Sequence, residues 1–202
     1  MSSGIRAERL FTDLCNRYFL RGFVFHSPQF FNPTENEAGD VVLWVRLDVV
    51  VFELISRDTT RGSTTKQFIK RIGQKRDQLL KDYRAFKDPN IDIHLVNEQG
   101  EQVPFDIRDR ATFDFSGVVI VDCSSHIEKL HFGTIEKSLA LPFPVAIMSR
   151  QDFLDLTAEV GLDHGAGHSL LLLCDAKASR GKNSMKFKGL GDDLFNVFIS
   201  LF

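Results

Sequence analysis

Two short apolar runs, separated by a charged turn, constrain the fold of this chain more than any other feature. They are VVLWV at 41–45 and DVVVFELI at 48–55. Both are too short for a core helix and are rich in β-branched and aromatic residues, so they predict two adjacent buried strands. Residues 46–48 then form the tight connection between the strands.

Two acidic residues accompany these runs. Asp40 directly precedes the first run, and Glu53 lies near the end of the second. A carboxylate in or at the end of a buried strand is costly to keep as an anion unless a cation, a metal ion or hydrogen-bond donors meet it. Asp40 and Glu53 are therefore the first candidates for a functional site, although Asp40 alone is also compatible with a loop cap.

The rest of the chain predicts helices and further strands in alternation. The expected helices are 5–20, about 64–86, 151–160 and 192–202, and the expected further strands are 23–26, 91–96, 117–123 and 144–149, with 169–175 as a further buried strand or helix segment. Residues 27–39 and 179–189 are expected to be loops because they contain Pro, Asn or Gly. This order predicts a single α/β domain, 1–202, with a central mixed β-sheet flanked by helices.

Charge is distributed unevenly along the chain. The whole sequence has a formal charge of −2, yet residues 57–87 contain ten Lys and Arg against three Asp. At helical spacing, one face of the expected helix carries Lys66, Lys70, Gln74, Lys81 and Arg84, opposite an apolar stripe. This face predicts contact with nucleic acid or another polyanion, and a solvated helix face is the alternative interpretation.

Carboxylates on neighbouring strands can hold Mg²⁺ or Mn²⁺ and leave coordination sites for water and phosphate. With these acids the chain resembles the PD-(D/E)xK nuclease superfamily, the restriction-endonuclease-like fold, in the order αβββαβ. The resemblance implies that Asp40 and Glu53 are the motif acids and that Glu8, on the first helix, is a third metal ligand. It also implies a nuclease-like core at about 5–122, a C-terminal α/β extension at about 123–202, and a basic helix from Lys66 that faces the site.

The motif lysine is missing, because position 55 is Ile55. Without a cation there, that strand cannot orient the attacking water or offset charge on the scissile phosphate. Some members of the superfamily supply this cation from the following helix, and Lys66 or Lys70 would do so here. The expected function is Mg²⁺- or Mn²⁺-dependent cleavage of nucleic acid, with DNA as the expected substrate.

Two other function classes stay open. One is a catalytically inactive nuclease-like domain that binds nucleic acid or protein within a larger assembly. The other is a structural module whose Phe-rich surface contacts a protein partner or a second copy of the chain. The sequence contains no GxGxxG, GxxxxGK[ST] or GxSxG motif, so the nucleotide-binding and hydrolase folds that depend on them are not predicted.

Three further patterns are weaker. Asp163, Asp175 and Lys177 form a second acid–acid–lysine set, and His164 and His168 have a spacing that zinc can use, although a loop without metal is favoured. The cysteines are Cys15, Cys123 and Cys174; they lie in apolar surroundings without CxxC spacing and suggest a reducing compartment. With no apolar leader or membrane-length run, we expect a cytoplasmic protein that does not contact a membrane.

Overall fold

The computed structural model describes residues 3–18, 21–31, 36–37, 39–45, 47–55, 65–97, 99–107, 110–121 and 140–154. Its elements, in chain order, are α1 (Ser3–Tyr18), η1 (Arg21–Phe23), β1 (Val24–Phe31), β2 (Asn36–Glu37), β3 (Val41–Val45), β4 (Asp48–Ile55), α3 (Thr65–Lys87), β5 (Asp92–Val96), β6 (Gln102–Pro104), β7 (Asp114–Val121) and β8 (Val145–Ser149). Residues 150–154, directly after β8, are helical.

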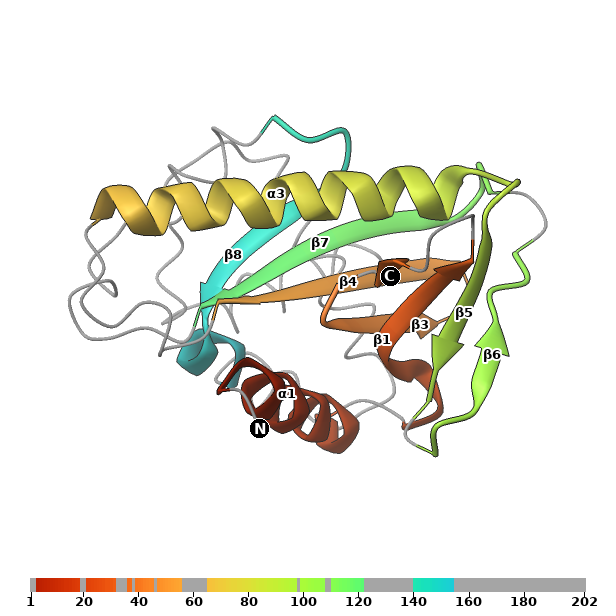
Figure 1. Ribbon diagram of the computed structural model, residues 1–202, viewed down its shortest axis with the longest axis horizontal. Helices are drawn as coiled ribbons and strands as arrows, with labels where there is room; N and C mark the ends of the chain where they lie inside the picture. The colour runs from red at the N-terminus through yellow and green to blue at the C-terminus, as the bar shows by residue number, and fades with distance from the viewer. Residues whose placement is uncertain are drawn as a thin grey trace, which may run out of the picture.

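The described strands form one eight-stranded mixed sheet (Figure 1). Its order is β6-β5-β1-β3-β4-β7-β8, with β2 paired to β1 beside this path. β1, β3 and β4 form an antiparallel meander, and β4, β7 and β8 are parallel to one another. α3 lies between β4 and β7 in the chain, so β4–α3–β7 includes the crossover that a parallel pair needs. The α/β class and the mixed sheet are confirmed.

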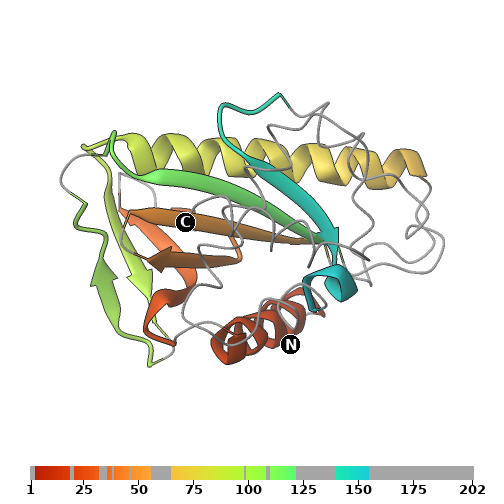
Figure 2. The same ribbon diagram turned by 180° about the vertical axis from the view of Figure 1, so that it is seen from behind.

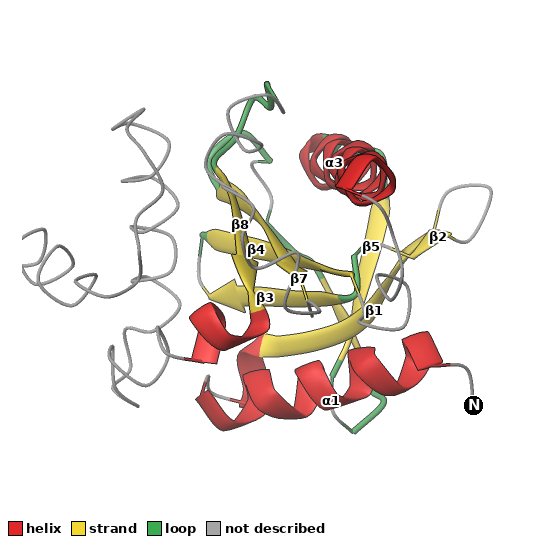
Figure 3. Ribbon diagram, turned by 90° about the vertical axis from the view of Figure 1, so that its left-hand side faces the viewer, coloured by secondary structure: helices red, strands yellow, loops and turns green. Residues whose placement is uncertain are grey.

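Helices cover both faces of the sheet (Figure 3). On one face, the buried side of α3 packs against β3, β4, β7 and β8; its buried hydrophobic residues are Phe68, Ile72, Leu79, Ala85 and Phe86. On the other face, Phe11 and Cys15 of α1 pack with Phe52 and with Phe153 from the helical segment 150–154. Figure 2 shows that short segment beside α1. Strand β4 is therefore covered on both sides, which explains its nearly continuous apolar sequence.

Alternation along β3 and β4 assigns each side chain to a face. Val42 of β3 and Val49, Val51 and Ile55 of β4 belong to the core beneath α3, whereas Val41, Leu43, Val50 and Phe52 belong to the core beside α1. Because strand side chains alternate with a period of two, Asp40 and Glu53 fall on the α3 face. Both candidate acids therefore occupy the same side of the sheet.

Two expectations about the strands need correction. The segment expected to be a loop at 27–39 contains β2 and the second half of β1, which continues from the strand expected at 23–26 to Phe31, and β6 is not among the expected strands. Pro28 has no backbone N–H to donate to a neighbouring strand. It is tolerated in β1 because the pairing of β1 with β5 is irregular between His26 and Gln29, where no regular inter-strand hydrogen bond is needed. β6 pairs with β5 after a turn in which Gly100 has a φ of 80°, and its three residues are too few to give a periodic signal.

The other expected helices and strands are confirmed where the structure describes them. Expected helices at 5–20 and 64–86 correspond to α1 and α3, and expected strands at 91–96, 117–123 and 144–149 correspond to β5, β7 and β8. β8 belongs to the proposed C-terminal extension, yet it pairs with β7 in the same sheet. The expected elements at 169–175, 179–189 and 192–202, and most of 151–160, lie outside the described residues.

None of the described helices has the length and apolar character needed to span a membrane.

Candidate functional site

The site begins at the turn into β3, where Gly39 has a φ of 57° and Asp40 follows it. The Asp40 backbone N–H donates to the Phe52 carbonyl at 3.0 Å, which extends the pairing of β3 with β4 by one residue. A Cβ at Gly39 would lie 2.5 Å from Cγ1 of Val51 and 3.2 Å from the Phe52 oxygen. A glycine is therefore required both for the backbone conformation and for the close approach of the two strands.

Asp40 is held in place by the backbone of β4. Its Oδ2 accepts a hydrogen bond from the Leu54 N–H at 2.6 Å, and the side chain remains 17% exposed. The carboxylate thus caps the end of the strand pair, as the simpler interpretation of the sequence suggested. The same oxygen also faces α3, where it lies 3.3 Å from Nζ of Lys75.

Lys75 connects the two candidate acids. Its Nζ donates to Oε2 of Glu53 at 2.5 Å as well as to Oδ2 of Asp40. Asp40 and Glu53 therefore lie close enough together to contact the same cation, here the Lys75 ammonium. The Lys75 side chain is 29% exposed, whereas that of Glu53 is 1% exposed. The site is thus accessible to solvent at Asp40 and Lys75, whereas Glu53 is buried beneath them.

The charge states of these groups follow from their burial. Burial and, to a smaller extent, the charge of Asp40 raise the pKa of Glu53 to about 7, although Lys75 opposes both effects. Burial lowers the pKa of Lys75, but the charges of Glu53 and Asp40 outweigh this effect and raise the pKa above its ordinary value. Lys75 is therefore an ammonium, and the arrangement requires a cation beside Glu53 to keep that carboxyl ionised.

Glu53 retains acceptor capacity that Lys75 does not use. Its Oε1 is buried and has no hydrogen-bond partner among the described residues. That oxygen lies 3.8 Å from the position that a Cβ at Gly39 would occupy. A buried carboxylate oxygen without a donor is costly, so it favours a ligand that supplies positive charge.

Glu8 lies on α1, which covers the opposite face of the sheet from α3 (Figure 3). Its negative charge contributes to the raised pKa of Glu53, so the two acids are within electrostatic reach of each other. Within the described ranges, no three His, Cys, Asp or Glu side chains come together as a group that could hold a metal ion. The structure thus brings Asp40 and Glu53 together, without assembling Glu8 with them into a three-ligand group.

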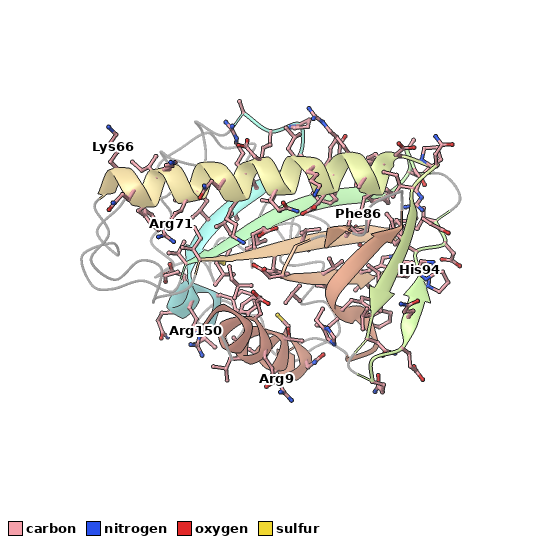
Figure 4. All side chains as sticks on the ribbon, in the orientation of Figure 1. Arg9, Lys66, Arg71, Phe86, His94 and Arg150 are labelled. Carbon is pink, nitrogen blue, oxygen red and sulfur yellow. The ribbon has the colours of Figure 1, made fainter. Side chains whose placement is uncertain are left out.

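The predicted basic face lies on the outer side of α3. Its members Lys66, Lys70, Gln74, Lys81 and Arg84 are all exposed. Figure 4 shows Lys66 pointing away from the sheet, whereas Arg71, one turn before Lys75, points to the sheet side of the helix. The lysine that contacts the acids is therefore Lys75, and not Lys66 or Lys70.

Sequence reasoning counted Lys75 among the basic residues but did not single it out. A usable signal was present, because Lys75 lies three residues after Ile72 and four before Leu79, within the apolar stripe of α3. A charged residue at such a position must meet a partner beneath the helix. Asp82, which falls seven residues after Lys75, carries the same signal.

Asp82 is a second buried acid on α3. It is 0% exposed, its Oδ1 accepts a hydrogen bond from Nε2 of Gln78 at 2.9 Å, and its Oδ2 has no hydrogen-bond partner in the described part of the chain. Burial raises the pKa of Asp82 to about 8, and the charge of Glu53 contributes to the increase. Asp82 is therefore mainly protonated at neutral pH.

The second acid–lysine set, Asp163, Asp175 and Lys177, and the histidines His164 and His168 lie outside the described residues, as do Cys123 and Cys174. Cys15 is a free thiol buried between α1 and the sheet, and burial raises its pKa.

No family model, curated protein or solved structure matches this chain.

Proposed function

We propose that this protein is a metal-dependent nuclease of the PD-(D/E)xK type, and that its nucleic-acid substrate is DNA. The observation that carries the proposal is the joint contact of Asp40 and Glu53 with the ammonium of Lys75. This set supplies two carboxylates and one lysine, the residue types of the motif, although the lysine comes from α3. The order α1, β1, β3, β4, α3, β7, with an antiparallel meander followed by a parallel strand, supports a restriction-endonuclease-like core.

The position of Ile55 explains why the cation would come from the helix. Ile55 is 4% exposed and packs in the core beneath α3, so that strand position contributes to packing. Lys75 reaches the same pair of acids from above. Its charge and its three N–H donors suit contact with a phosphate oxygen or with an attacking water.

Asp40 and Glu53 fit a bound Mg²⁺ or Mn²⁺. Both ions prefer carboxylate oxygens, Mg²⁺ commonly binds through one or two carboxylates plus substrate phosphate, and Oε1 of Glu53 is buried without a donor among the described residues. When bound, the ion would polarise the scissile phosphate and make water more acidic. The Leu54 N–H would orient Asp40, and Arg71 would lie one turn from Lys75 for contact with an adjacent phosphate.

The inactive binding domain is the second candidate, and one observation favours it. Lys75 already provides Asp40 and Glu53 with a positive partner, so the three residues are also compatible with a partly buried structural ion pair. In that case the exposed basic face of α3 would bind nucleic acid without cleavage. Activity measurements separate the two candidates.

The test is a cleavage assay with purified protein, Mg²⁺ or Mn²⁺, and single-stranded DNA, double-stranded DNA or RNA. We expect metal-dependent cutting of DNA that Asp40→Asn abolishes and Lys75→Met slows by on the order of a hundredfold, the usual cost of losing a preorganised charge donor. Arg76→Gln is the matched control, because it removes one positive charge beside Lys75 from a side chain that pairs with Asp77 at the surface.

Absence of cutting with every substrate and either ion would reject the nuclease and leave the inactive binding domain. Cutting that survives Asp40→Asn would place the chemistry elsewhere in the chain. The set Asp163, Asp175 and Lys177 would then be examined first.

A further inference from the structure

The ammonium of Lys75 lies where a cation shared by Asp40 and Glu53 would have to lie. We propose that Lys75 and a divalent metal ion compete for these two carboxylates: Lys75 neutralises them in the metal-free protein, and the ion displaces it. This inference rests on the proposed function, since it takes the ion to be the Mg²⁺ or Mn²⁺ of that site. It adds a mobile residue whose position depends on whether metal is bound.

Geometry makes simultaneous occupancy unfavourable. Nζ of Lys75 lies 2.5 Å from Oε2 of Glu53 and 3.3 Å from Oδ2 of Asp40. A Mg²⁺ ion bound to the same oxygens would lie about 2.0–2.1 Å from each of them, because that is the usual Mg²⁺–oxygen distance. Two cations would then be packed against the same pair of oxygens in a partly buried site, where repulsion between them is poorly screened.

Lys75 is the member of the set that can move. Asp40 is fixed by the Leu54 N–H, and Glu53 is 1% exposed within β4, which is covered on both faces. Lys75 is 29% exposed and carries its charge on a flexible four-carbon chain. Displacement would swing the ammonium toward solvent, where the backbone of a bound nucleic acid would offer it a phosphate oxygen.

Glu53 provides a second, independent observation. Its Oε1 is buried and has no hydrogen-bond partner among the described residues, so Lys75 satisfies only one oxygen of this carboxylate. A metal ion accepts one or both oxygens of a carboxylate ligand. Exchange of Lys75 for a metal ion would therefore give Oε1 a partner that Lys75, which donates to Oε2, does not provide.

Metal titration of the intact chain tests the exchange without requiring nuclease activity. Mn²⁺ affinity is measured by isothermal titration calorimetry for the wild type and for Lys75→Met, Asp40→Asn and Arg76→Gln. We expect Lys75→Met to bind Mn²⁺ on the order of tenfold more tightly, because the ion no longer has to displace the ammonium; tenfold corresponds to about 1.4 kcal/mol. Asp40→Asn should lose binding, and Arg76→Gln should change affinity by less than about threefold.

A second measurement uses the wild type alone and so does not depend on how Lys75→Met folds. In ¹⁵N-lysine NMR spectra, Mg²⁺ should shift the Nζ resonance of Lys75 toward the position of solvated lysines. Equal or weaker Mn²⁺ binding by Lys75→Met, an unchanged Lys75 resonance on saturation with Mg²⁺, or no metal binding by either protein would each overturn the exchange. DNA cleavage together with equal affinities would retain the nuclease proposal and reject only the exchange.

Discussion

Replacing Asp82 with Asn should change how the stability of this protein depends on pH. Asp82 is 0% exposed, and its pKa is raised to about 8 in the folded chain, against about 3.9 for an unperturbed Asp. Between these values, the folded state keeps the Asp82 proton while the unfolded state has released it. The native state therefore binds more protons, and stability falls as pH rises through this interval.

The magnitude follows from the one proton involved. The contribution of Asp82 is fully present below about pH 4 and is lost by about 1.4 kcal/mol per pH unit until its folded pKa is reached. From about pH 5 to about pH 7 the loss is roughly 3 kcal/mol. Asn at this position keeps an oxygen that can accept the hydrogen bond from Gln78 but has no proton to lose, so this part of the pH dependence should disappear.

Urea unfolding at several pH values between about 5 and 7 measures the effect. Relative to the wild type, the free energy of unfolding of Asp82→Asn should rise by about 1.4 kcal/mol per pH unit. The groups whose charges act on Asp82 are Glu53, Asp40 and Lys81, and they are present in both proteins, so their titration largely cancels in the difference. Asp77→Asn is the control, because Asp77 is on the same helix but is 64% exposed.

Parallel stability curves for Asp82→Asn and the wild type would refute this reasoning. They would mean that Asp82 is already ionised in the folded protein, so that burial does not hold its proton. Asp77→Asn should follow the wild type within about 0.5 kcal/mol at every pH.

Two further predictions concern a glycine at the site and the basic surface. Gly39→Ala should destabilise the protein by about 1–3 kcal/mol in urea unfolding, because the φ of 57° and the 2.5 Å approach to Val51 both oppose a side chain. Gly73 lies within α3, and a Cβ there would meet nothing within 4 Å outside the nearby backbone of the helix, so Gly73→Ala should instead stabilise the protein by about 0.5–1 kcal/mol. Destabilisation by Gly73→Ala, or unchanged stability of Gly39→Ala, would contradict the described packing. If the basic face of α3 binds DNA, affinity should fall steeply with salt, and Lys70→Gln should reduce the slope of log K against log[salt] by about one. Salt-independent binding would leave this face without a role in phosphate contact.

Local sequence was sufficient for most of the secondary structure. Runs of β-branched residues identified β3, β4, β7 and β8, and helical periodicity placed α3 within one or two residues of its ends. These sequence patterns predict the elements correctly because a few neighbouring residues determine both the backbone preference and the buried face. Side chains on the buried face recur at the period of the helix or strand, so the pattern can be seen in the sequence. β6 and the second half of β1 escaped prediction because their pairing partners, rather than their own sequences, make them strands.

The two acids of the candidate site could also be predicted from sequence. Asp40 and Glu53 lie at one end of a short strand pair, and the antiparallel pairing of β3 with β4 has a register in which Val41 lies opposite Phe52. With this register, both carboxylates must lie near the same end of the pair. The prediction depended on a separation of only thirteen positions within one hairpin.

Lys75 is different because its contacts cross the fold. It is 22 and 35 residues from its two partners, and its role depends on how far α3 extends over β4. Helical spacing alone shows that Lys75 belongs to the buried stripe and that Lys66 and Lys70 do not, but it does not say which strand lies beneath. The strand beneath Lys75 is determined by the order β4–β7–β8 in the sheet and by the packing of α3 against these strands. Both result from the burial of apolar area over the whole sheet. Local pattern therefore located the acids, and long-range packing selected the cation that meets them.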